Sequence, residues 1–225
     1  MFVLDILFPV RCLGCGYLGV YICPCCEKKL HTVNTQACIY CKKSSLYGLT
    51  HPICKRRGGV DGHITLFYYD NTLKKIIKGI KYSLTTDAWA DMLHIITKQG
   101  RYELLFYKNI ARLRAQPIPL SEGKEKKRGF NQAKIITNTL SLLLQIKTTS
   151  LLKRKQDSPP QAQIKRENRF KNIKGAFYID KGKKAHDNIL IVDDVVTSGA
   201  TVKEAARVLK RAGAKKVYVF SIAKG

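Results

Sequence analysis

The sequence ILIVDDVVTSGAT, residues 189–201, begins with four apolar residues and ends with hydroxyl side chains around a glycine. A short, wholly apolar run is typical of a strand that is buried on both faces of a parallel sheet. The residues that follow predict an amphipathic helix over 201–212, which stops at Gly213, and a second strand over 217–222. Strand, helix and strand form a βαβ unit, so we predict an α/β fold with a parallel sheet.

The loop of this unit carries polar groups that suit a sugar phosphate. Asp193 and Asp194 follow the apolar strand, and their carboxylates can accept hydrogen bonds from neighbouring hydroxyls of a ribose. The next polar residues provide amides and hydroxyls at a helix N-terminus, which is a favourable place for a phosphate. These phosphate-binding candidates are Thr197, Ser198, Gly199, Ala200 and Thr201. The sequence therefore predicts a site for a ribose 5-phosphate at the carboxyl end of the strand.

Other readings of this loop remain open. Acidic residues also follow strands in receiver domains and beside P-loops, but the chain has no Gly-x-x-x-x-Gly-Lys-Ser/Thr motif. A receiver-type acid pair would not need a loop of hydroxyls and glycine. A solvated turn between strand and helix is the simplest alternative.

The composition favours a folded protein with an acidic partner. The chain has 225 residues, of which 45% are hydrophobic, enough to form one full domain and a small accessory unit. Its 41 Lys and Arg against 16 Asp and Glu give a net charge of +25. Such a field attracts nucleic acid, acidic membrane surfaces or phosphorylated metabolites.

The sequence also predicts a cytoplasmic protein without a membrane span. No apolar run reaches the roughly 18 to 20 residues that cross a bilayer. The apolar start, residues 1–10, lacks the basic region of a signal peptide and contains Asp5 and Pro9.

All eight cysteines lie within the first 54 residues, which marks a boundary in the chain. Three pairs have the spacing Cys-x-x-Cys, and His51-x-x-Cys54 forms a fourth pair of equal spacing. Two such pairs complete the tetrahedral shell of a structural zinc. The predicted zinc ligands are Cys12, Cys15, Cys23 and Cys26 in one site, and Cys38, Cys41, His51 and Cys54 in another.

Several alternatives accompany this metal prediction. The pairs could form disulfides, or a single zinc could bind, and Cys25 leaves the ligand choice at its own pair open. Redox activity is disfavoured because the pairs precede no βαβ pattern. We predict a zinc-binding domain over 1–60 and an α/β domain over 61–225, and we expect metal removal to unfold the first but not the second.

The region between the cysteines and the βαβ unit predicts a mixture of strands and helices. Apolar periodicity indicates a strand over 64–68 and helices over 73–80 and 88–98. A further strand over 110–116 contains two arginines, which is unusual for a buried parallel strand and suggests an edge position or a shifted register.

With the acid pair and the hydroxyl loop in place, the sequence resembles the type I phosphoribosyltransferases and, within them, the competence protein F family. Further stretches carry this resemblance across nearly the whole chain. They are the cysteine pairs, Lys81-Tyr82, PIPL at 117–120, RGFNQA at 128–133, SPPQ at 158–161 and RENRFKNIKGAF at 166–177.

The resemblance implies an N-terminal zinc ribbon followed by a phosphoribosyltransferase-like α/β domain. It implies that Asp193 and Asp194 are catalytic and that phosphoribosyl pyrophosphate (PRPP) binds with Mg²⁺. The loop over 119–132 would hold the pyrophosphate, with Arg128, Gly129, Asn131 and Gln132 as candidate ligands. A basic segment over 153–171 matches the mobile lid of the superfamily, although a charge run is often only a solvated face. The lid candidates are Gln161, Arg166, Arg169 and Asn172.

Three functions of different class follow. The family implies a competence protein that handles incoming single-stranded DNA during natural transformation, together with other competence proteins such as a DNA-translocating helicase. The alternatives are a transferase that moves phosphoribose from PRPP to a nucleobase-like acceptor, and a PRPP sensor without catalysis. Basic clusters at 124–128 and 153–171, with Phe130 and Phe170 nearby, are the predicted DNA contacts, so PRPP and DNA are expected to compete.

Overall fold

The computed structural model describes residues 9–82, 87–155 and 173–225. Its centre is a five-stranded sheet in the order β1-β7-β6-β2-β3, and every pair of neighbours is parallel. This confirms the predicted parallel sheet. The strands are β1 (Gly62–Tyr68), β2 (Leu113–Pro117), β3 (Lys147–Thr148), β6 (Asn188–Val196) and β7 (Lys216–Lys224).

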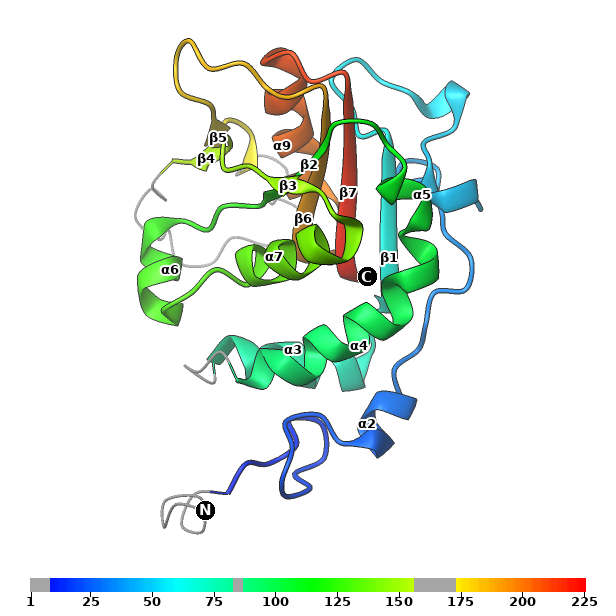
Figure 1. The fold of residues 1–225 in the computed structure, drawn as a ribbon, viewed down its shortest axis with the longest axis vertical. Coiled ribbons are helices and arrows are strands. Elements are labelled where there is room, and N and C mark those ends of the chain that lie inside the picture. Colours follow the sequence, from blue (N-terminus) through cyan, green and yellow to red (C-terminus); the bar gives the residue numbers. More distant parts are fainter. Residues whose placement is uncertain (1–8, 83–86, 156–172) are drawn as a thin grey trace.

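Helices cover both faces of this sheet (Figure 1). Alternate residues of β6 explain why, because Leu190 and Val192 join the core on one face and Ile189 and Ile191 join the core on the other. The first face packs against α3 (Asn71–Tyr82), α4 (Ala88–Glu103), α5 (Leu105–Lys108) and α7 (Gln132–Leu144). The second face packs against α9 (Ala200–Arg211).

The observed helices agree with the predicted ones to within a few residues, but two strands differ. The sequence places Asp193 and Asp194 in a loop, whereas β6 continues through them to Val196. The reason is that Val195 and Val196 are β-branched and extend the pairing with β7.

The second difference concerns β2. The predicted edge position is wrong, because β2 pairs with β6 on one side and with β3 on the other. The strand also starts later than expected, at Leu113, since Arg112 has a left-handed backbone with φ 54° and belongs to the preceding turn. Arg114 therefore lies near the amino end of the strand, where its side chain can leave the core.

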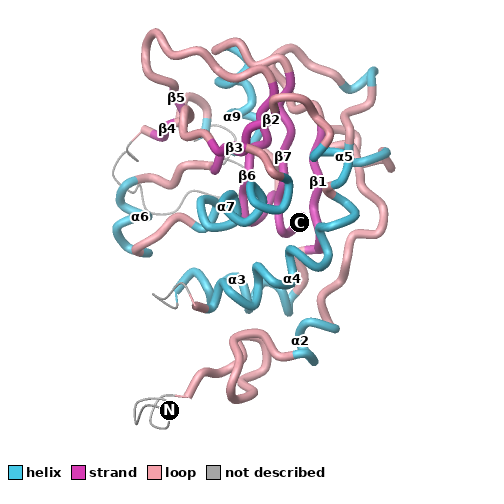
Figure 2. Tube along the Cα trace, in the orientation of Figure 1, coloured by secondary structure: helices cyan, strands magenta, loops and turns pink. Residues whose placement is uncertain are grey.

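Residues 9–61 are mostly loop (Figure 2). The helical elements in this described stretch are the short α2 (Pro24–Lys28), η1 (Leu46–Gly48) and η2 (Pro52–Cys54). This segment packs on the sheet domain at two places: Ile22 and Leu30 join the core around α3 and α4, and Ile39 joins the core around α9. The boundary near residue 60 stays a prediction.

Two peripheral elements complete the fold. Strands β4 (Lys153–Arg154) and β5 (Phe177–Tyr178) form a small antiparallel sheet, and α6 (Glu122–Arg128) follows β2. Among the described residues, no helix is both long enough and apolar enough to span a lipid bilayer.

Candidate functional site

The sheet reverses its direction of winding between β2 and β6. From β2 the chain moves outward to β3, and from β6 it moves the opposite way to β7. Ligands of open α/β sheets bind at such a switch point, outside the carboxyl ends of the strands. Residues 118–132 leave β2 and residues 197–201 leave β6 at this place, so the topology brings the two predicted phosphate loops to the same end of the sheet, where open α/β sheets have their binding crevice.

Asp193 and Asp194 lie in the last part of β6, where Asp193 is opposite Ser221 of β7. An Asp193 carboxylate oxygen accepts a hydrogen bond from the Asp194 amide at 2.9 Å. The Asp194 carboxylate forms an ion pair with Lys81 near the C-terminal end of α3. The two side chains of that pair are only 14% and 20% exposed, so this cation lies within the half-buried site.

Burial raises the pKa of Asp193 well above its usual value of 3.8, and the neighbouring Asp194 carboxylate raises it further, while Lys81 opposes the shift. An acid pair of this kind favours a cation or hydroxyl donors near its oxygens. The arrangement suits ribose hydroxyls or a hard cation such as Mg²⁺.

We expect Asp193→Asn to stabilise the protein at neutral pH. The pKa of Asp193 is higher in the folded than in the unfolded chain, so its contribution to folding becomes less favourable as pH rises from about 4 through the folded pKa. Asparagine avoids this cost, and the gain in melting temperature should shrink as the pH is lowered toward 4. Thermal melting across pH measures it.

The control for this variant is Asp87→Asn, which makes the same chemical change at an exposed position without a side-chain cap. It should alter the free energy of unfolding by no more than about 0.5 kcal/mol at any pH. A wild-type protein at least as stable as Asp193→Asn at pH 7 would contradict the expectation.

The hydroxyl loop connects β6 to α9. Gly199 has φ 74°, a left-handed conformation that glycine adopts without strain, and it is the N-cap of α9. The first amide to bond back is that of Lys203, to the Gly199 carbonyl at 3.0 Å, so the amides of residues 200–202 precede the helical hydrogen bonds. Thr197 and Ser198 are exposed beside them. The loop thus has the donors that a phosphate monoester needs.

The loop after β2 is held against β6 by its backbone. The Ile118 amide donates to the Val192 carbonyl at 2.9 Å, and the Asn131 side-chain amide donates to the Ile118 carbonyl at 3.1 Å. Asn131 is also the N-cap of α7, where its side-chain oxygen accepts from the Ala133 amide at 2.9 Å. Both ends of this side chain are therefore engaged, and Asn131 shapes the loop.

The other three candidates of this loop lie beside Asn131. Gly129, with φ 76°, ends α6, and Arg128 is half-buried and donates to the Gln132 side-chain oxygen at 3.1 Å. Two buried polar atoms of the loop, Ser121 Oγ and Gln132 Nε2, have no hydrogen-bond partner among the described residues. Buried polar groups normally have partners, so these two atoms have hydrogen-bonding capacity that the described residues leave unused.

The sequence named neither Lys81 nor Ser121 as a ligand, although Ser121 lies in the loop predicted to hold the pyrophosphate. Lys81 stands at the end of α3, and only the tertiary fold brings its ammonium to Asp194. Ser121 directly follows Pro119 and Leu120, and its place beside a switch point was the available signal. The lid candidates Gln161, Arg166, Arg169 and Asn172 lie outside the described residues.

The cysteines gather into the two predicted clusters. In each cluster the four ligand atoms lie within 4.8 Å of one another, and all eight cysteines are free thiols. The Cys15 and Cys23 sulfurs are 3.6 Å apart, and Cys41 Sγ is 3.3 Å from His51 Nδ1. Tetrahedral zinc with Zn–S bonds of about 2.3 Å places its sulfurs roughly 3.8 Å apart, so both donor sets fit a structural metal. The first contains Cys12, Cys15, Cys23 and Cys26, and the second Cys38, Cys41, His51 and Cys54.

The local environment of two of the cysteines favours metal binding. Burial acts to raise the pKa of Cys12 and of Cys38, but backbone hydrogen bonds outweigh it and lower each pKa to about 6. One thiol of each cluster is thus largely a thiolate at neutral pH, the form that binds metal. Cys25 is exposed and belongs to neither cluster.

Comparisons with known proteins agree with this architecture. Residues 126–224 match the family model of the phosphoribosyl transferase domain. The chain is 24% identical to competence protein F of Haemophilus influenzae over 96% of its own length and 98% of that protein. It is 24% identical to competence protein ComFC of Streptococcus pneumoniae, over 89% of this chain and 86% of the relative.

A third relative is the DNA utilization protein YhgH of Escherichia coli, with 28% identity over 71% of this chain and 70% of that protein. The predicted fold, a phosphoribosyltransferase-like parallel sheet flanked by helices, is confirmed by the family match and the observed sheet. The chain is therefore similar to the competence protein F proteins over most of its length, and its residues 126–224 match the phosphoribosyl transferase domain.

Proposed function

We propose that the crevice at the ends of β2 and β6 binds PRPP with Mg²⁺. One observation carries this proposal: an acid pair, a helix N-terminus and a loop with unpartnered polar atoms converge at the switch point of the sheet. Each group matches one part of PRPP, namely the ribose hydroxyls, the 5-phosphate and the pyrophosphate.

The residues divide among these parts as follows. Asp193 and Asp194 accept from the ribose hydroxyls, and residues 197–201 donate to the 5-phosphate. Arg128, Gly129 and Gln132, with Ser121, face the pyrophosphate, and Asn131 holds their loop in shape. Mg²⁺ would be held by the acid pair and would neutralise charge on the pyrophosphate.

We further propose a role in the handling of single-stranded DNA during natural transformation. The named relatives are competence and DNA utilization proteins, and a net charge of +25 exceeds what a small phosphate ligand requires. Other competence proteins, such as a DNA-translocating helicase, are the expected partners. The proposal includes a cytoplasmic location, because seven thiols kept for metal binding suit a reducing compartment.

A single assay tests the PRPP proposal and separates its alternatives. The purified protein is incubated with Mg²⁺ and PRPP, with and without candidate nucleobases and DNA, while PRPP binding and pyrophosphate release are measured. Release that depends on one acceptor would identify a transferase, and binding without release would identify a sensor or scaffold. Absence of PRPP binding would contradict the proposal.

The DNA role predicts binding at physiological salt. A labelled single-stranded oligonucleotide should bind with little sequence preference, and the affinity should fall steeply as salt rises, because phosphate contacts release counterions. Any very basic protein adheres to DNA at low salt, so the informative measurement is made at about 0.15 M, where the screening length is roughly 8 Å. Undetectable binding there would contradict direct DNA handling by this chain.

A further inference from the structure

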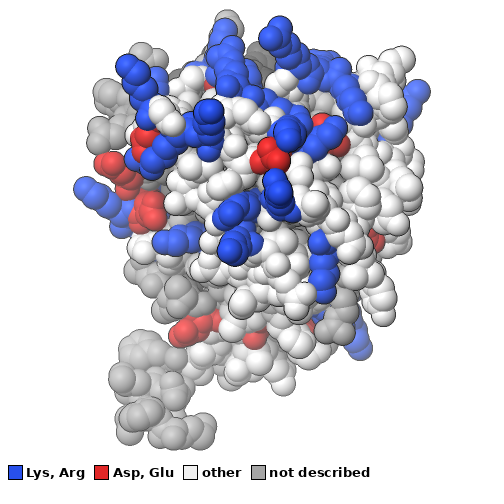
Figure 3. All heavy atoms as spheres, turned by 45° about the horizontal axis from the view of Figure 1, so that its top comes forward, with Lys and Arg blue, Asp and Glu red and all other residues white. Residues whose placement is uncertain are grey.

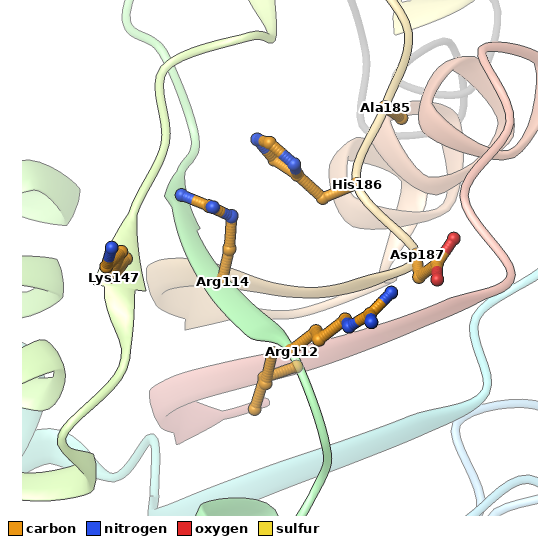
Figure 4. Close-up of a pocket in the computed structure, with 7 residues that line it drawn as sticks. Arg112, Arg114, Lys147, Ala185, His186 and Asp187 are labelled. Carbon is orange, nitrogen blue, oxygen red and sulfur yellow. The ribbon is translucent and has the colours of Figure 1, made fainter.

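A second site lies at the opposite end of the sheet from the PRPP crevice. A cavity of about 510 Å³ opens at the amino ends of β2, β3 and β6. Figure 4 shows Arg114 and His186 directed into the same space from neighbouring segments, with Lys147 beside them on β3. The lining residues are Arg112, Leu113, Arg114, Lys147, Ala185, His186 and Asp187.

This cavity has an excess of positive charge. Across residues 9–82, 87–155 and 173–225, no carboxylate forms an ion pair with Arg112, Arg114 or Lys147. The single acid of the lining, Asp187, already pairs with Lys215 at 3.2 Å. Three cations around one hollow create a positive potential that attracts an anion.

Asp61, which lies near this end of the sheet, also forms ion pairs with lysines. Asp61 is shared between Lys210 and Lys216, the latter at 3.5 Å. Lysine and arginine side chains cover much of the upper surface in Figure 3, which turns this end of the molecule toward the viewer, and few acids appear among them. The cavity is therefore part of a wider basic surface.

Hydrogen bonds hold the walls of the cavity in place. The Ala185 amide donates to the Ala212 carbonyl at 2.9 Å, and the Lys215 and Lys216 amides both donate to the Asp187 carbonyl, at 2.7 and 2.9 Å. On the other wall, the Asn188 side-chain amide donates to the Ala111 carbonyl at 2.7 Å. The cations thus sit on a preorganised frame, which reduces the entropy lost when a ligand binds.

Two local features support a binding role. Arg112 holds a left-handed backbone with φ 54°, a conformation that is uncommon for a residue with a side chain and that concentrates at functional sites. Burial lowers the pKa of His186, and the positive charge of Arg114 lowers it further, while Asp187 opposes them. A neutral imidazole beside two guanidinium groups offers a flat surface for a base.

We propose that this cavity and the basic surface around it bind the phosphodiester backbone of a single-stranded nucleic acid, apart from the PRPP crevice. A cavity of this volume admits one phosphate and its nucleoside at a time, and a flexible single strand can bend into the hollow, whereas a stiff duplex cannot. The inference rests on the proposed DNA role and assigns its contacts. The sequence predicts that PRPP and DNA compete. The present inference differs from that expectation, because it places the nucleic acid and PRPP at opposite ends of the sheet.

The test compares two triple variants in oligonucleotide titrations at several salt concentrations. The cavity variant is Arg112→Gln/Arg114→Gln/Lys147→Gln, and the matched control is Lys124→Gln/Lys126→Gln/Lys127→Gln on exposed α6. Loss of three phosphate contacts should weaken binding roughly tenfold to a hundredfold at about 0.15 M salt and reduce the slope of log K against log salt by about 2. The control should keep most of the affinity, and saturating PRPP should not displace the strand.

Lys147→Glu is a second variant that is expected to stay folded. Lys147 is exposed on a two-residue strand, so its replacement does not change the packing of the core. It should weaken binding more than Lys147→Gln while leaving the melting temperature and PRPP binding unchanged. If the wild type binds no oligonucleotide, both this inference and the DNA role fail. If the wild type binds but only the α6 variant loses affinity, or if PRPP displaces the strand, or if duplex binds more tightly, this inference alone is overturned.

Discussion

Replacing Asp193 and Asp194 together by alanine is expected to abolish Mg²⁺-dependent binding of PRPP. Each carboxylate would make at least one charged hydrogen bond to the ligand, and such bonds contribute about 1.5 to 3 kcal/mol each. Two of them correspond to a loss of affinity of roughly a hundredfold to ten-thousandfold. Calorimetric titration of PRPP into the folded variant, with Mg²⁺ present, measures the loss.

The variant should remain folded, although its acids lie within β6. Burying the Asp193 carboxylate as an anion is unfavourable, so its removal should increase the free energy of unfolding. The loss of Asp194 acts in the opposite direction, because it leaves Lys81 without its ion-pair partner. We expect the melting temperature to change by only a few degrees, since about 1 kcal/mol shifts it by roughly 2 to 4 °C in a chain of this size.

Asp87→Ala serves as the control and should bind PRPP like the wild type, because Asp87 is exposed and caps no amide through its side chain. Undiminished PRPP binding by the folded double variant would show that the PRPP site lies elsewhere. Loss of binding in the control as well would point to a general effect of removing acid from this basic chain.

The βαβ unit could be predicted from sequence because its signals are local. Four apolar residues, a glycine-containing turn and a helical period follow one another within a short stretch around Gly199. The end of β6 was less predictable, since acids usually mark a loop. Pairing of Val195 and Val196 with β7 overrides that preference.

Features that join distant segments could not be predicted in this way. The ion pair between Lys81 and Asp194 links α3 to β6, and no local pattern encodes it. The basic cavity likewise combines three separate segments, namely residues 112–114, Lys147 and residues 185–187. Taken alone, the sequence of each segment predicts only an ordinary charged surface. The two arginines that looked out of place in the predicted strand over 110–116 lie where the amino ends of three strands meet.

The metal clusters were predictable because tetrahedral coordination imposes a local spacing. When two residues separate a pair of ligands, both can project from a single turn toward the same metal. The structure brings these pairs together in the two predicted clusters. The ambiguity at Cys25 is resolved only by tertiary structure. Its side chain is exposed, whereas Cys26 is 2% exposed and packs in the core.

Elemental analysis of protein purified without chelator is expected to find close to two zinc ions per chain. Both clusters have donor sets and separations that fit zinc, and a structural zinc binds with about 10 to 16 kcal/mol in small metal-dependent domains. Close packing supports the first site, because a Cβ atom added at Gly14 would lie 2.6 Å from the Cys26 sulfur.

Removal of the metal should unfold residues 1–60 and leave the sheet domain folded but less stable. Its described part, residues 9–60, is mostly loop and has little regular structure to hold it without metal. Its Ile22 and Leu30 belong to the same apolar cluster as residues of the sheet domain such as Ile76 of α3, and unfolding would expose part of that cluster. Hydrogen exchange, followed with and without chelator, should show early exchange before β1 and a lower melting temperature for the remainder.

Paired variants test each cluster separately. Cys26→Ser should lose the first zinc, whereas Cys25→Ser, its exposed neighbour outside the cluster, should retain both. His51→Ala should lose the second zinc, and His51→Cys should keep it, because thiolate and imidazole are interchangeable in tetrahedral structural sites. Wild-type protein without stoichiometric zinc, or chelated protein whose first 60 residues remain protected from exchange, would contradict a metal-dependent N-terminal segment.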